Sequence, residues 1–208
     1  MWRWGRIHWL RVDNGSPFGD PTRQAVSILH LCLTAHGIRL KVNPPRTPTR
    51  NAKVERNQGT TARWAEPDKC KDYLELQQRL NQAVEEQREC YPTRVCGGKT
   101  RAQAYPELLK NPIRFDVQDF KLSRVHQFLA QGQWKRMVSD RGSVDLFWQN
   151  YQLGRKHRRR KVLAKLNYEA LQWEFYCSQG QIIKVLPMKP MTKTQLKSGV
   201  KARYKQKG

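Results

Sequence analysis

Two acidic residues stand in local sequences that favour chemistry at a metal ion. Asp13 follows a short apolar stretch and opens the segment Asp13-Asn14-Gly15, and Glu55 lies in the segment Asn51-Ala52-Lys53-Val54-Glu55-Arg56. The chain between them predicts a helix, a strand and a proline-rich loop, an order that can bring two distant carboxylates together at a strand end. Carboxylates that hold divalent ions in this way are typical of nucleases and strand transferases. A two-metal site normally has a third carboxylate, but none of the twelve residues before Asp13 is acidic.

The residues around the two acids predict alternating strands and helices. In order, we expect a strand over 6–12, a helix over 22–35, a strand over 38–42, a loop over 43–49, and helices from about 51, over 69–89 and over 100–109. The first strand delivers Asp13 to its carboxyl end. Gly37 is the expected C-terminal cap of the first helix. Thr100 and Gln103 have the spacing of a capping box.

The pattern changes near residue 134, where short apolar strands separated by turn signals predict a small antiparallel β-barrel. The expected strands cover 134–139, 144–148, 161–166, 171–177 and 181–186, and a helix over 119–130 precedes them. Trp134, Trp148 and Trp173 are expected in the core of the barrel. The predicted organisation is therefore a domain over 1–112, a connector over 113–133, a barrel over 134–187 and a disordered basic tail over 188–208.

The charge of the chain points to a polyanionic partner. It has 40 Lys and Arg against 17 Asp and Glu, a formal net charge of +23, and nucleic acid is the simplest partner for such an excess. A membrane surface is the competing polyanion, but no apolar run reaches the roughly 20 residues of a membrane span, and the N-terminus lacks the pattern of a signal peptide. We expect a cytoplasmic protein. The five irregularly spaced cysteines are better explained as reduced thiols than as zinc ligands.

One basic run stands between two of the predicted strands. Its cations are Arg155, Lys156, Arg158, Arg159, Arg160 and Lys161. A run this dense predicts a cationic loop that contacts DNA phosphates with strong salt dependence. The alternative is a solvated hairpin tip.

The motifs of the first half together resemble a known family. The segments are Asp13-Asn14-Gly15-Ser16-Pro17-Phe18, Gly37-Ile38 and Asn51-Ala52-Lys53-Val54-Glu55-Arg56. They are similar to the catalytic core of bacterial insertion-sequence transposases related to retroviral integrases. The resemblance implies a ribonuclease H-like fold in which three carboxylates hold two Mg²⁺ or Mn²⁺ ions, with Asp13 and Glu55 as the second and third carboxylates. It also implies that Lys53 and Arg56 contact phosphates, although an ordinary charged helix face is the alternative.

The first aspartate of the family would lie upstream of Met1, so we expect a truncated core that is catalytically inactive alone. The expected fold is α/β plus all-β: a partial ribonuclease H-like integrase core, then helices, then a small SH3-like β-barrel. The expected function is DNA binding and, in the complete form, metal-dependent strand transfer in transposition and DNA integration. The expected partners are DNA, another copy of the chain or a separately encoded N-terminal half. The alternative is a non-enzymatic regulator or another nucleic-acid-binding protein, including one that binds RNA.

Overall fold

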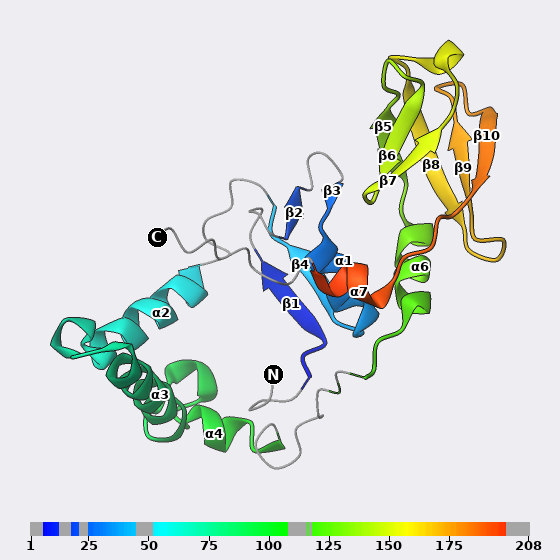
Figure 1. Cartoon of the computed structure of the whole chain (residues 1–208). Helices are drawn as coiled ribbons and strands as arrows, with labels where there is room; N and C mark the ends of the chain where they lie inside the picture. Colours follow the sequence, from blue (N-terminus) through cyan, green and yellow to red (C-terminus); the bar gives the residue numbers. More distant parts are fainter. Residues whose placement is uncertain are drawn as a thin grey trace. The chain divides into compact units, whose positions relative to one another are not determined.

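The computed structural model describes residues 6–12, 18–20, 25–44, 52–107, 116 and 118–198 (Figure 1). The chain divides into two compact units, each described here by itself. The sheet unit comprises His8–Val42 and Asp116–Gly208, and the helical unit comprises Met1–Ile7 and Asn43–Phe115. The described residues form a mixed α/β structure with six α-helices, a parallel two-strand sheet and a four-strand antiparallel sheet. No helix in these ranges is both long and apolar enough to cross a lipid bilayer.

The N-terminal part of the sheet unit is a β-α-β segment. Strand β1 (Trp9–Val12) pairs in parallel with β4 (Arg39–Val42), and Val12 lies opposite Val42. Helix α1 (Ile28–Ala35) connects them, and Gly37 follows it with φ +73°, a left-handed conformation that glycine adopts without strain. Both predicted strands and the glycine at the helix end are confirmed. The carboxyl ends of β1 and β4 therefore leave the sheet at the same edge.

Helix α1 begins later than the sequence predicts. Ser27 is its N-cap and accepts a hydrogen bond from the backbone N–H of His30 at 3.1 Å. Upstream, β2 (Gly19–Asp20) and β3 (Ala25–Val26) form a short antiparallel pair. The predicted start at residue 22 was wrong because Ala25 and Val26 suit a strand as well as a helix, so only the pairing with β2 decides between them.

The C-terminal strands form an open sheet. Strands β5 (Trp134–Met137), β8 (Lys161–Asn167), β9 (Gln172–Tyr176) and β10 (Ile182–Pro187) pair in the order β10-β9-β8-β5, all antiparallel. Strands β6 (Ser143–Leu146) and β7 (Gln149–Gln152) pair only with each other in the described structure. The predicted closed barrel was wrong, because this hairpin does not join β5 to β10 through backbone hydrogen bonds.

The hairpin also changes the position of one tryptophan. Trp134 and Trp173 are buried, as expected, but Trp148 is 56% exposed. Phe147 and Trp148 form the turn between β6 and β7 with φ values of +49° and +65°. Strand β7 was missed because its Gln-Asn-Tyr-Gln sequence has little apolar content, and large aromatic residues rarely occupy a turn with two positive φ angles.

Three helices complete the core of the sheet unit. Helix α1 packs against both α6 (Leu122–Gln131) and α7 (Lys193–Ser198), and α6 also contacts β8. Buried Leu31 of α1, Leu129 of α6 and Leu196 of α7 belong to the same cluster as Trp173 of the sheet. Residues 188–198 therefore differ from the expected solvated tail. Met191 and Leu196 supply enough apolar surface to bury a short amphipathic helix.

In its described residues, the helical unit has two long helices and a short third one. Helix α2 (Ala52–Ala65) packs against α3 (Tyr73–Glu89), and α3 packs against α4 (Arg101–Ala104). The predicted capping box is confirmed: Thr100 accepts from the N–H of Gln103, and the Gln103 side chain accepts from the N–H of Thr100.

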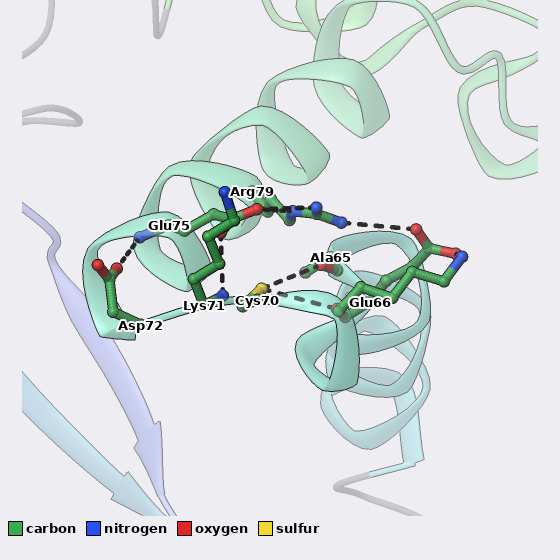
Figure 2. Close-up of polar contacts among 8 residues, drawn as sticks. Ala65, Glu66, Cys70, Lys71, Asp72, Glu75 and Arg79 are labelled. Carbon is green, nitrogen blue, oxygen red and sulfur yellow. Dashed lines mark hydrogen bonds and ion pairs between the residues drawn. The ribbon is translucent and has the colours of Figure 1, made fainter.

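Polar contacts hold the corner between α2 and α3 (Figure 2). Arg79 of α3 lies between Glu75, 2.8 Å away, and Glu66 of the connecting turn, 3.6 Å away. Asp72 caps α3 by accepting from the N–H of Glu75 at 2.8 Å. The Cys70 thiol donates to the carbonyl oxygen of Glu66 at 3.6 Å. These contacts join the end of α2 to the start of α3.

Leu31→Ala tests whether α1 shares the core of the sheet unit. Leu31 is fully buried, so its truncation leaves a cavity and should lower the free energy of unfolding by about 2–5 kcal/mol. Denaturant unfolding followed by tryptophan fluorescence measures the loss. Leu74→Ala on α3, where Leu74 is 56% exposed, is the control and should change little. Equal effects of the two substitutions would contradict the shared core.

Candidate nucleic-acid interface

The basic run forms a surface loop between β7 and β8, which we call the basic loop (residues 155–161). A single 3₁₀ turn, η5 (Arg155–His157), opens it, and strand β8 begins at Lys161. Its six cationic side chains are all exposed: Arg155, Lys156, Arg158, Arg159, Arg160 and Lys161. The predicted location between two strands is confirmed.

The base of the basic loop is fixed by a close backbone contact. Gly142 has φ +78°, and a Cβ at this position would lie 2.4 Å from the carbonyl carbon of Gly154. Its carbonyl oxygen accepts from the N–H groups of Leu153 and Gly154 at 2.8 and 2.9 Å. Only glycine fits this position without displacing the chain. Gly142 lies between the predicted strands 134–139 and 144–148, where a turn is expected, but nothing in the sequence indicates its contact with Gly154.

The far end of the basic loop is tied to the end of β5. The backbone N–H of Val138 donates to the carbonyl oxygen of Arg160 at 3.0 Å. The backbone N–H of Arg159 donates to the carbonyl oxygen of Val138 at 2.9 Å. The loop backbone is therefore held at both ends, which fixes the positions from which its cationic side chains leave the surface.

One acid interacts directly with the basic loop. Asp140 pairs with Arg159, with 2.6 Å between Nε and Oδ1, and the hydrogen bond and charge of Arg159 hold the pKa of Asp140 below its usual value. Among the described residues no ion pair engages the other five cations of the loop. Most of its positive charge is thus left for a partner.

His157 reports the electrostatic potential of the basic loop. Its pKa is lowered by loss of hydration and then by the charges of Lys156, Arg160 and Lys184. Lys184 reaches the loop from β10 and donates to the carbonyl oxygen of Gln152 at 2.9 Å. Sequence reasoning missed Lys184 because nothing in the chain indicates that β10 passes close to the loop.

The candidate metal ligands are only partly described. Glu55 lies exposed in the first turn of α2, Lys53 occupies the same turn, and Arg56 follows on the exposed surface of the helix. Asp13 lies outside the described residues. Strand β1, which leads to Asp13, and α2 belong to different units, so the pairing of Asp13 with Glu55 stays a prediction.

No group of three or more His, Cys, Asp or Glu side chains in the described ranges is placed to hold a metal ion. Of the two expected ligands, these ranges include Glu55. Neither protein-family models nor curated proteins match this sequence.

The potential at the basic loop is testable through His157. The double substitution Lys156→Ala and Arg160→Ala should raise the pKa of His157 toward its usual value, because nearby positive charge disfavours the imidazolium ion. An NMR titration of the histidine ring protons measures this change. Lys71→Ala, distant in sequence and in the other unit, should leave the His157 titration unchanged. If the pKa of His157 is unchanged in the double variant, the cations of the basic loop lie too far from His157 in solution to affect its charge.

Proposed function

We propose that this chain binds DNA and that the basic loop makes the main phosphate contacts. The observation that carries the proposal is the loop itself, in which six exposed cations have one ion-pair partner among the described residues, Asp140, on a backbone fixed at both ends. Lysine and arginine bind phosphate oxygens, and arginine does so with paired N–H groups. A fixed array loses less conformational entropy on binding than a mobile tail does.

The net charge of +23 supports a partner with a high density of negative charge. Duplex DNA carries one phosphate for about every 1.7 Å of its axis, so neutralising several phosphates releases condensed counterions. This release supplies a large binding free energy without any base contact. The proposed binding is therefore strong at low salt and largely independent of sequence.

We further propose that the chain is related to the integrase-like transposases that its motifs resemble, with the ribonuclease H-like core that this implies. The β1-α1-β4 segment supports this relation, because parallel pairing of β1 and β4 sends the chain toward Asp13 and toward α2 from the same edge of the sheet. In this proposal Asp13 and Glu55 bind Mg²⁺ or Mn²⁺, and Lys53 and Arg56 contact phosphates nearby. A bound divalent ion would supply activation of water or of a DNA 3′ hydroxyl.

The basic loop is equally compatible with a non-enzymatic regulator that binds DNA, or with a protein that binds RNA. The phosphates of RNA and DNA offer the loop the same chemistry, so charge does not separate these candidates. Competition between duplex DNA and structured RNA for the same protein does. Preference for RNA at equal salt would favour the alternative.

The triple substitution Arg158→Ala, Arg160→Ala and Lys161→Ala tests the proposed function. Each lost phosphate contact removes about 0.9 from the slope of log affinity against log salt, so the slope should fall by roughly two to three. Affinity for duplex DNA at moderate salt should fall by roughly ten-fold or more. Fluorescence anisotropy with a labelled duplex measures both quantities.

The matched control removes the same charge elsewhere, with Lys71→Ala, Lys99→Ala and Lys121→Ala at three exposed positions. Both variants lower the net charge by three. If the two lower DNA affinity equally, binding depends on net charge alone and the basic loop is not the interface.

The metal proposal has a separate test in Asp13→Asn and Glu55→Gln. If the two acids hold Mn²⁺, the ion should raise the melting temperature of the unchanged protein by about a few degrees and should raise that of neither variant. DNA affinity should persist in both variants, because the basic loop is intact. Asp116→Asn, outside the motifs, is the control. A full Mn²⁺ response in Asp13→Asn would remove this residue from the site.

A further inference from the structure

A large groove lies within the helical unit, away from the basic loop in sequence. It has a volume of about 1030 Å³, at the upper end of the roughly 300–1,000 Å³ typical of small-ligand sites. One face of α2 forms a wall through Arg56, Thr60, Arg63 and Trp64, which recur at helical spacing. The end of α3, the following 3₁₀ turn η4 (Arg94–Cys96) and α4 form the rest.

Three partly exposed aromatic rings line this groove. Trp64, Tyr91 and Tyr105 are 38%, 54% and 48% exposed; Trp64 belongs to α2, and Tyr91 and Tyr105 follow the last turns of α3 and α4. Trp64 and Tyr91 meet edge to face, with ring centroids 5.5 Å apart. Large rings that converge on one groove while remaining in contact with water favour a planar partner that stacks on them.

Within the described residues, every charged residue of the groove is positive. Arg56, Arg63, Arg88 and Arg101 line it, and none of the described lining residues is Asp or Glu. Three of them also have contacts within the protein: Arg63 donates to the carbonyl oxygen of Gly59 at 3.4 Å, Arg88 pairs with Glu89, and Arg101 donates to the backbone carbonyl oxygen of Gln87 at 2.7 Å. Arginines beside aromatic rings suit a ligand that alternates planar apolar groups with negative charges.

The walls of the groove are held together before any ligand binds. The side-chain amide of buried Gln87 in α3 donates to the Thr61 hydroxyl of α2 at 3.0 Å. The backbone carbonyl oxygen of Gln87 accepts from the Arg101 guanidinium of α4. The capping box at Thr100 fixes the start of α4. A preformed site loses little free energy to ordering when it binds.

We infer that this groove binds unpaired nucleotides of a nucleic-acid strand. Bases stack on the aromatic rings and phosphates contact the arginines, which is the usual combination for single-stranded nucleic acid. Paired bases are stacked on each other within a duplex, so the groove selects single-stranded segments, whereas the basic loop takes phosphates of either kind. This inference rests on the proposed function only in that the partner is nucleic acid.

The test compares a labelled oligothymidine with a labelled blunt duplex by fluorescence anisotropy. The double substitution Tyr91→Ala and Tyr105→Ala should weaken oligothymidine binding by roughly 25-fold or more, because each lost base stack costs about five-fold or more. Duplex affinity should stay within about two-fold, since the phosphate contacts of the basic loop remain. Tyr73→Ala, at a tyrosine that is 77% exposed on α3 and does not line the groove, is the matched control.

A second variant guards against loss of folding in the first. Arg56→Gln keeps all the rings and changes one exposed side chain of α2, and it should lower the salt slope for oligothymidine by about 0.7. Circular dichroism confirms the helix content of each variant. Unchanged oligothymidine binding in both folded variants would overturn the inference, as would displacement of oligothymidine by an acidic peptide at similar concentration.

The loop triple variant separates the two proposals. If it loses duplex binding but keeps the tyrosine-dependent binding of oligothymidine, both stand. If the triple substitution leaves duplex binding unchanged while the tyrosine substitutions still weaken oligothymidine binding, the proposed loop interface is wrong and the inference about the groove is supported. If the tyrosine substitutions leave oligothymidine binding unchanged while the triple substitution weakens duplex binding, the inference about the groove is wrong and the proposed loop interface is supported.

Discussion

A line of aromatic contacts holds the sheet unit together. His30 of α1 contacts Phe128 of α6 with ring centroids 4.9 Å apart, and Phe128 lies 6.2 Å from Trp134 of β5. Trp134 meets Phe147 of the β6–β7 turn edge to face at 4.9 Å, and Phe147 stacks on Trp173 of β9 at 5.8 Å. Segments from both ends of the chain thereby share one core. Because the sheet is open, these contacts supply the closure that a barrel would obtain from backbone hydrogen bonds.

Trp134 has the most constrained position in this line. Its Nε1 donates to the carbonyl oxygen of Leu129 at 2.9 Å, which ties β5 to the end of α6. A Cβ at Gly132 would lie 2.3 Å from the Trp134 ring, so the connection between α6 and β5 needs glycine there. Arg124 extends the same junction by donating to the carbonyl oxygen of Ala35 at 3.0 Å, at the end of α1. The strained turn at Phe147 is maintained because burial of its ring in this core offsets the cost of a positive φ.

The two proposed surfaces use positive charge differently. The basic loop lies on the rim of the sheet unit, where water screens the mutual repulsion of its cations and the fixed backbone sets their spacing. In the groove of the helical unit, arginines lie beside Trp64, Tyr91 and Tyr105, and Arg101 also joins α4 to α3 by donating to the backbone carbonyl oxygen of Gln87. The loop suits phosphates alone, and the groove suits phosphates joined to exposed bases. Together they fit a protein that contacts both paired and unpaired nucleic acid.

The sequence by itself determined the features that depend on neighbouring residues. Strands β1 and β4, the glycine after α1, the capping box at Thr100 and the place of the basic loop between two strands all follow from local apolar patterns and backbone preferences. The tertiary structure alone decided the burial of α7, the exposure of Trp148, the open sheet and the approach of Lys184 to His157. These depend on which distant segments pack together, and strands of similar composition do not specify their partners. The groove also depends on tertiary structure. Its arginines and aromatic rings lie as far as 49 positions apart in the sequence, from Arg56 to Tyr105. Only the packing of α2, α3 and α4 brings them to one surface.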